Sequence, residues 1–285
     1  MPPEDALGRA RERYIELLKR SLLGELYYDN ELRIRYLLQC VQRRAEFSPE
    51  TLHDIRRHEP EEAARRIAAD AIGMPLDLKL ENLGFPHTML GRKRLDHLEW
   101  CVRTVIAEKV PGDFIECGIW RGGAVVLIRA LLEILEEPGR FVWAADSFQG
   151  IPPPTHPEDV AFGLDLSRER FPMLAIPRAT VERTLADYGF SDDRVRFLEG
   201  WFKDTLPSAP ITRLSILRLD GDIYESTADA LGALYDKLVP GGFLIIDDHF
   251  VPTCKKAVED FRRIRGITEP IVPIDWTGVY WRKER

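Results

Sequence analysis

After Pro111-Gly112, short apolar runs alternate with helical stretches, and this alternation restricts the possible folds more than any other feature of the sequence. Strands that alternate with helices form a parallel sheet with helices on both faces. Runs that are apolar almost throughout fit strands buried on both sides. The predicted strands are Phe114–Cys117, Phe141–Ala145, Val195–Leu198, Leu214–Leu219 and Phe243–Ile246. The predicted helices are Ala124–Leu135, Ala179–Tyr188, Tyr224–Leu238 and Thr253–Ile264.

The C-terminal end departs from this alternation. Ile267–Ile274 and Thr277–Arg282 are two β-like runs with only Asp275-Trp276 between them. Because no helix separates the two runs, we expect an antiparallel hairpin added to the parallel sheet. The sequence therefore predicts an α/β, Rossmann-like fold whose mostly parallel, seven-stranded sheet ends in a C-terminal antiparallel hairpin.

Residues 1–108 show a helical pattern instead. Apolar side chains at helical spacing line one face from Leu7 to Leu22, and Glu61–Ala71 and Arg92–Ala107 are two further predicted helices. We therefore divide the chain into an N-terminal helical extension, 1–108, and a second domain, 109–285. An apolar helix face must be buried against something, so we expect the extension to offer a partner surface and the protein to be a homo-oligomer.

Composition excludes several classes of function. A net charge of -7 argues against nucleic-acid binding through bulk electrostatics. No apolar stretch approaches the 18 residues or so that a membrane span needs, and the charged N-terminus has no apolar signal core. The four cysteines are widely spaced without a CxxC pair, which predicts reduced thiols and a cytoplasmic protein.

Ligands of open α/β sheets bind beyond the carboxyl ends of the strands, so residues that follow each predicted strand are candidate site residues. The first strand ends in the segment Glu116-Cys117-Gly118-Ile119-Trp120-Arg121-Gly122-Gly123. Its glycines let the backbone approach a ligand, although a tight turn explains them equally well. The spacing differs from G-x-G-x-x-G, so the dinucleotide fingerprint is absent, while the acid at position 116 suits a cationic or hydroxylated ligand.

The next two strand ends add an acid and an aromatic side chain. Asp146 lies 23 residues beyond Gly123, a position that suits ribose hydroxyls, with loop capping as the alternative. The third strand is followed by Gly200 and Trp201. An aromatic ring at that place stacks on a flat base or packs in the core, and the sequence leaves both interpretations open.

Acidic residues end the last two parallel strands. Asp220 and Asp222 follow the fourth strand, and Asp247, Asp248 and His249 follow the fifth. Neighbouring strands bring these ends together, and oxygen ligands at such density suit Mg²⁺ first, with Mn²⁺ and Ca²⁺ as alternatives. We expect ligation by Asp220, Asp247 and Asp248. Asp222 is expected to cap the following helix instead. His249 is open as a ligand, a base or a polar loop residue.

A long proline-rich segment, Gly150–Arg178, interrupts the alternation. Loops of this length inside a compact domain are usually functional or disordered. Phe162, Leu164, Phe171 and Met173 supply apolar anchors, so an ordered lid over the site is favoured over a free linker.

Five motifs in this order resemble one known family, the macrocin O-methyltransferases: ECGIWRGGA, DSFQGIPPP, EGWFKDTLP, LRLDGDIYEST and LVPGGFLIIDDH. The resemblance spans roughly residues 86–285 and reaches back more weakly to Tyr14–Glu31. It implies a class I methyltransferase fold and an enzyme dependent on S-adenosylmethionine and Mg²⁺. Such enzymes methylate sugar hydroxyls of antibiotics, so the implied partner is a glycosylated natural product.

Carried over position by position, the resemblance assigns a role to each site residue. Asp220, Asp247 and Asp248 would bind the metal, and Asp220 would also be the general base. The residues that would contact the cofactor are Thr88, Met89, Glu116, Cys117, Gly118, Ile119, Trp120, Asp146, Ser147, Gly200 and Trp201.

The hypothesis drawn from these residues is methyl transfer to one of two neighbouring hydroxyls held at the metal. Two alternatives stay open within enzymes: an O-methyltransferase acting on a catechol, which also has vicinal oxygens, and a nicotinamide-dependent oxidoreductase. The absent G-x-G-x-x-G and the terminal hairpin argue against the oxidoreductase. A non-catalytic scaffold would not need the acid cluster.

Overall fold

A computed structural model describes residues 3–61, 64, 68 and 86–284 of the chain. The chain forms two compact units, Met1–Arg92 and Lys93–Arg285. Among the described residues, none of the helices combines the length and the apolar character needed to cross a lipid bilayer.

The first unit is helical, as the sequence predicts. The apolar repeat from Leu7 to Leu22 falls within one helix, α1, whose residues Ile15 and Leu22 are buried. The helix predicted at Glu61–Ala71 lies mostly outside the described residues. The elements of this unit are α1 (Pro3–Leu22), η1 (Glu25–Tyr27), α2 (Tyr28–Arg43), α3 (Pro49–His53) and α4 (Ile55–His58).

The second unit is built on a seven-stranded sheet in the order β3-β2-β1-β4-β5-β7-β6. Strands β1 to β5 are parallel, and β7 runs antiparallel to both β5 and β6. This confirms the predicted mostly parallel sheet and its C-terminal antiparallel hairpin. The strands are β1 (Asp113–Cys117), β2 (Val142–Asp146), β3 (Val195–Glu199), β4 (Leu214–Leu219), β5 (Leu238–Ile246), β6 (Val272–Pro273) and β7 (Val279–Arg282).

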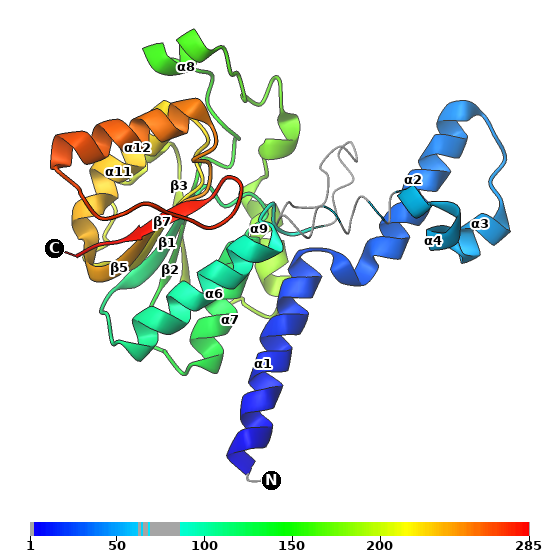
Figure 1. Ribbon diagram of the computed structural model, residues 1–285, viewed down its shortest axis with the longest axis horizontal. Helices are drawn as coiled ribbons and strands as arrows, with labels where there is room; N and C mark the ends of the chain where they lie inside the picture. Colours follow the sequence, from blue (N-terminus) through cyan, green and yellow to red (C-terminus); the bar gives the residue numbers. More distant parts are fainter. Residues whose placement is uncertain (1–2, 62–63, 65–67, 69–85, 285) are drawn as a thin grey trace. The chain divides into compact units, whose positions relative to one another are not determined.

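Helices cover both faces of this sheet, with α11 and α12 on one face and α6 and α7 on the other (Figure 1). Strand side chains alternate between the faces, so Leu217 and Leu219 meet the α11 side while Arg218 points the other way. The helices of this unit are α6 (Arg92–Ala107), α7 (Gly123–Ile134), α8 (Pro157–Phe162), η2 (Pro172–Leu174), α9 (Arg178–Asp187), α10 (Phe202–Thr205), α11 (Tyr224–Leu234), η3 (Tyr235–Lys237) and α12 (Pro252–Arg265). The structure groups α6 with this unit, while the predicted domain limit at residue 108 stays a prediction.

The fifth strand begins earlier than its apolar run. The predicted helix Tyr224–Leu238 gives way at Leu234 to a short 3-10 turn, and β5 starts at Leu238 rather than at Phe243. Pairing with β4 slips there, because Leu214 faces Leu238 while Ile216 faces Phe243. The slipped part contains Pro240-Gly241-Gly242. Proline and glycine are uncommon inside strands, so an apolar pattern does not predict a strand there.

The proline-rich segment is held by polar contacts instead of the apolar anchors expected from the sequence. Phe162, Phe171 and Met173 keep 39% or more of their surface exposed. Asp159, at 1% exposure, accepts the backbone N–H groups of Tyr224 at 2.8 Å and of Glu225 at 3.1 Å. The expectation of apolar anchoring at these three side chains is therefore wrong. The segment is held by the buried carboxylate of Asp159, in α8, which binds the first N–H groups of α11.

Candidate active site

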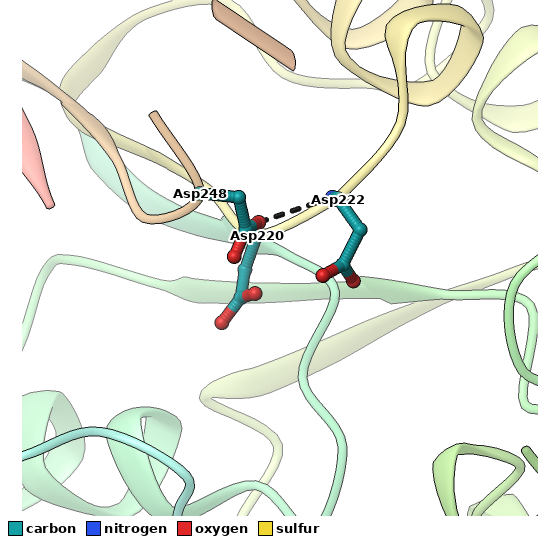
Figure 2. Close-up of side chains that lie close together, drawn as sticks. All are labelled: Asp220, Asp222 and Asp248. Carbon is teal, nitrogen blue, oxygen red and sulfur yellow. Dashed lines mark hydrogen bonds between the residues drawn. The ribbon is translucent and has the colours of Figure 1, made fainter. Parts of the chain in front are cut away.

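Three carboxylates gather where β4 and β5 end. Asp220 follows β4 and Asp248 follows β5, and the parallel register places Leu219 opposite Ile246 just before them. Asp222 completes the group, because each of the three offers a carboxylate oxygen and these oxygens lie within 4.8 Å of one another (Figure 2). The structure thus brings together two of the three predicted metal ligands and adds Asp222.

Asp222 does not cap α11, so that expectation is wrong. The N-cap residue is Ile223, which makes no side-chain cap hydrogen bond, and the first N–H groups of the helix are taken by Asp159. Asp222 instead has a positive φ of 57° and donates its backbone N–H to Asp248 Oδ2 at 3.0 Å (Figure 2). This turn places its carboxylate beside those of Asp220 and Asp248.

Burial and mutual repulsion raise the pKa values of these three acids. Burial, followed by the charge of Asp247, raises the pKa of Asp220 to about 6. Burial and then Asp220 raise the pKa of Asp222 to about 7, and the pKa of Asp248 rises as well for the same two kinds of reason. Because a quarter of the Asp220 side chain is exposed, solvent screens part of this repulsion. A site with excess negative charge of this kind can hold a cation.

Asp247, the third predicted ligand, is engaged by two arginines. Its Oδ1 accepts a hydrogen bond from Arg218 at 2.6 Å, and its Oδ2 accepts one from Arg94. Its carbonyl accepts the hydroxyl of Thr277 at 2.9 Å. Both carboxylate oxygens of Asp247 are thus bonded to arginines, and ligation of a metal by Asp247 stays a prediction.

Asp247 belongs to a buried charge network, which we define as Asp275, Arg94, Asp247, Arg218 and Glu116. Arg94 lies 3.0 Å from Asp275, and Arg218 donates to Glu116 at 2.5 Å. No side chain of this network is more than 7% exposed. Sequence reasoning missed both arginines. The signal that could have found Arg218 is strand alternation, which puts it on the same face as Glu116, its register partner on β1.

Glu116 has one carboxylate oxygen left over. Its Oε1 accepts from Arg218, while its buried Oε2 accepts no hydrogen bond from any described residue. Burial raises the pKa of Glu116 to about 8, so the protonated acid is favoured without a ligand, and a cationic ligand beside Oε2 would favour the carboxylate. A buried, unsatisfied acceptor at the end of β1 fits a ligand with a cationic or N–H donor group. Beside it, burial raises the pKa of the Cys117 thiol, which favours the neutral form.

The loop after β1 is shaped by its neighbours in the sheet. A Cβ on Gly118, whose φ is +85°, would lie 1.8 Å from the carbonyl oxygen of Asp220, so this glycine is needed for the approach of β4. Ile119 donates its N–H to Asp146 Oδ2 at 2.9 Å, and Phe148 donates to Oδ1 at 2.7 Å. Asp146 therefore joins the loop after β1 to the loop after β2, which is the capping role considered as the alternative to ribose binding. Trp120 donates its indole N–H to the carbonyl of Met173 at 3.0 Å.

The remaining predicted cofactor contacts are placed less directly. The hydroxyl of Ser147 donates to the carbonyl of Gly150 at 2.8 Å and so closes the turn after β2. Gly200 has a φ of +138°, and Trp201 after it is half-buried, next to α10. Thr88 and Met89 belong to the first unit, so their place in a cofactor pocket stays a prediction.

Comparison with known proteins settles the family. The family model for macrocin O-methyltransferase (TylF) matches residues 11–283. The chain belongs to the macrocin O-methyltransferase family. Among solved structures, the O-methyltransferase NovP is 37% identical, with a TM-score of 0.76 over 96% of this chain and 100% of that chain. The predicted class I methyltransferase fold and the predicted enzyme class, an O-methyltransferase, are both confirmed.

Two curated relatives are O-methyltransferases whose names give their substrates. The chain is 51% identical over 199 residues to the 8-demethyl-8-(2,3-dimethoxy-alpha-L-rhamnosyl)-tetracenomycin-C 4'-O-methyltransferase of Streptomyces olivaceus, covering 69% of this chain and 75% of the relative. It is 49% identical over 200 residues to the mycinamicin III 3''-O-methyltransferase of Micromonospora griseorubida, covering 69% and 78%.

Proposed function

We propose that this O-methyltransferase moves a methyl group from S-adenosylmethionine to a sugar hydroxyl of a glycosylated natural product such as an antibiotic, with a divalent cation at the acidic group. The tetracenomycin and mycinamicin relatives support this acceptor: by their names, the first methylates a rhamnosyl tetracenomycin and the second methylates mycinamicin III. The observation that carries the cation is the cluster of Asp220, Asp222 and Asp248 within 4.8 Å.

The residues fit a hard divalent cation. Carboxylate oxygens are the ligands that Mg²⁺ prefers, with Mn²⁺ and Ca²⁺ as substitutes. Burial first, and then repulsion among the carboxylates, raises the pKa values of Asp220, Asp222 and Asp248, and a bound cation would offset both effects. A bound cation would lower the pKa of a substrate hydroxyl and neutralise these acids. Asp220 and Asp248 would hold it with a third acid, either Asp222 or the predicted Asp247.

The cofactor would lie at the ends of β1 and β2, where the loop Glu116–Trp120 follows the first strand. The free oxygen of Glu116 would accept a hydrogen bond from the amino group of the methionine part. Asp146 and Ser147, at the end of β2, would face the ribose, because an acid after the second strand suits ribose hydroxyls.

Asp220 is the group that we assign as general base. In the metal-free protein burial raises the pKa of Asp220 to about 6, and a bound cation would keep its carboxylate unprotonated and so able to accept a proton. The proton of the reacting hydroxyl would pass to its carboxylate as the oxygen attacks the methyl carbon. The fixed ends of β1 and β4 would supply the alignment of oxygen, methyl and sulfur on which the rate depends.

The test is methyl transfer to glycosylated macrolide and aromatic polyketide acceptors, followed by mass spectrometry with and without a chelator. We expect turnover to vanish in excess EDTA and to return with Mg²⁺. Full turnover in EDTA would remove the cation from the proposal. Methylation of a simple catechol at a higher kcat/KM than any glycoside would favour the catechol alternative. A homo-oligomer and a cytoplasmic location stay predictions.

A further inference from the structure

Arg218 contacts both halves of the candidate active site. Its Nη1 donates to Glu116 Oε1 at 2.5 Å, at the end of the strand that carries the cofactor loop. Its Nη2 donates to Asp220 Oδ2 at 3.0 Å and to Asp247 Oδ1 at 2.6 Å, where β4 and β5 end. With only 2% of its surface exposed, the guanidinium is fixed among three carboxylates.

A positive side chain beside a cation site needs a physical reason, because its charge repels the cation. One reason is geometry. The guanidinium is planar, and its donors form a rigid fork that can hold several carboxylate oxygens in set directions. Carboxylates that bind metals are themselves held by hydrogen bonds, and loss of such a partner typically weakens metal affinity about 10- to 100-fold. A lysine at the same place would keep the charge but would offer one nitrogen to three acids.

We propose that Arg218 is a positioning residue that holds Asp220 directly, and Asp248 through its chain neighbour Asp247, in place for the cation and ties them to Glu116 on the cofactor side. The inference rests on the proposed function, because it presupposes a cation at the acidic group. It assigns Arg218 a role beyond neutralising buried acids. Arg94, which holds the other oxygen of Asp247, would share this role at one carboxylate.

Arg218→Lys tests the proposal because it keeps the net charge and removes the fork. Binding of Mn²⁺ to the folded protein is measured by electron paramagnetic resonance without acceptor or cofactor, and binding of S-adenosylhomocysteine by calorimetry. We expect the Mn²⁺ dissociation constant to rise about tenfold or more. The affinity for S-adenosylhomocysteine should fall as well, because Glu116 loses its partner.

The matched control is Arg129→Lys. Arg129 is 5% exposed and bonds Asp192 at 3.3 Å, so it is a buried, ion-paired arginine of the same unit whose partner is not one of the site acids. Wild-type affinities for Mn²⁺ and S-adenosylhomocysteine are expected in this variant. A loss equal to that of Arg218→Lys would mean that any buried arginine matters equally, and it would overturn the proposal.

A second substitution, Arg218→Met, separates the effect of geometry from that of charge by the direction in which it changes Mn²⁺ affinity. If Arg218 acts only as a charge, Arg218→Lys keeps wild-type Mn²⁺ affinity and Arg218→Met binds Mn²⁺ more tightly, and this pair of results overturns the proposal while leaving the cation site intact. If the wild-type protein binds no Mn²⁺, the proposed cation itself fails and the inference fails with it.

Folding is checked by circular dichroism and thermal unfolding, since removing one partner of a buried ion pair strongly destabilises a protein. Should Arg218→Lys not fold, Arg94→Lys decides. We expect a several-fold loss of Mn²⁺ affinity in that variant with wild-type affinity for S-adenosylhomocysteine. Wild-type Mn²⁺ affinity in Arg94→Lys would then overturn the proposal.

Discussion

Asp159 Oδ1 accepts the backbone N–H of Tyr224 at 2.8 Å from a position 65 residues earlier in the chain. Its other oxygen accepts the next N–H, that of Glu225, at 3.1 Å. Both N–H groups belong to the first turn of α11, where a helix has no partners of its own for them. The proline-rich segment therefore supplies the cap of the helix that follows Asp220 and Asp222.

Replacing Asp159 by alanine should destabilise the second unit. Two backbone donors lose their acceptor, so we expect the free energy of unfolding in urea to fall by about 2 kcal/mol. Limited proteolysis should also cut residues 150–178 faster. Asp165→Ala is the control, because within the described part of the chain Asp165 bonds only to its own segment, and its side chain is 39% exposed. Equal losses in the two variants would contradict a special role for the cap.

Gly118→Ala should be far more costly than an alanine at another glycine of like conformation. Gly118 and Gly189 share a φ of +85°, but a Cβ would lie 1.8 Å from the Asp220 carbonyl oxygen at the first and meets nothing within 4 Å at the second. Chemical denaturation should show a loss of about 1 kcal/mol for Gly189→Ala, from backbone strain alone. For Gly118→Ala we expect about 3 kcal/mol or more, or no soluble protein.

The third carboxylate of the cation site can be identified by two isosteric substitutions. In Asp222→Asn and Asp247→Asn the side-chain shape is kept and one charge is removed. We expect Asp222→Asn to weaken Mn²⁺ binding about tenfold or more if it is a ligand, since its carboxylate lies in the group with Asp220 and Asp248. Asp247→Asn should lower thermal stability more, because it leaves two buried arginines short of a partner.

The opposite ranking of the two metal affinities would restore Asp247 as the ligand expected from the sequence. Asp204→Asn, on the short helix α10, is the control for loss of an acid in this unit. It should leave both Mn²⁺ affinity and thermal stability at wild-type values.

Stability of the metal-free protein should depend on pH through the acidic group. Burial and repulsion raise the pKa of Asp222 to about 7 and of Asp220 to about 6, from an ordinary value of 3.8 in the unfolded chain. Between about pH 4 and pH 7 the folded protein therefore holds protons that the unfolded chain has released. These groups then make the free energy of unfolding fall as pH rises, by up to about 1.4 kcal/mol per pH unit for each.

Other titrating groups are removed from this comparison by taking the difference between two proteins. In urea unfolding with EDTA from pH 5 to pH 8, the free energy of unfolding should fall more steeply for the wild type than for Asp222→Asn. The variant lacks the titrating carboxyl of Asp222, and the pKa of Asp248 is raised less because a neighbouring charge is gone. Added Mg²⁺ should stabilise the wild type more at pH 8 than at pH 5, where protons compete for the carboxylates. If the two proteins show the same pH dependence of the free energy of unfolding in EDTA, the folded protein does not hold extra protons at Asp222.

The order of the elements was predictable from local pattern, and the site only in outline. Apolar runs and helical periods gave all five parallel strands and the terminal hairpin, although Gly241 and its neighbours concealed the start of β5. Strand-end logic located Asp220 and Asp248 correctly at one edge of the sheet. It failed for Asp222, because a residue with positive φ does not follow the capping statistics of aspartate.

The sequence by itself determined the α/β class, the hairpin and the acids at two strand ends, because periodicity and strand-end position are local properties. Only the tertiary structure decided the partners of those acids. Arg94 and Arg218 lie 153 and 29 residues from Asp247, and Asp159 caps a helix 65 residues away. Such pairings depend on which chain segments the fold brings together, and a buried charge is stable only where the fold provides its counter-charge.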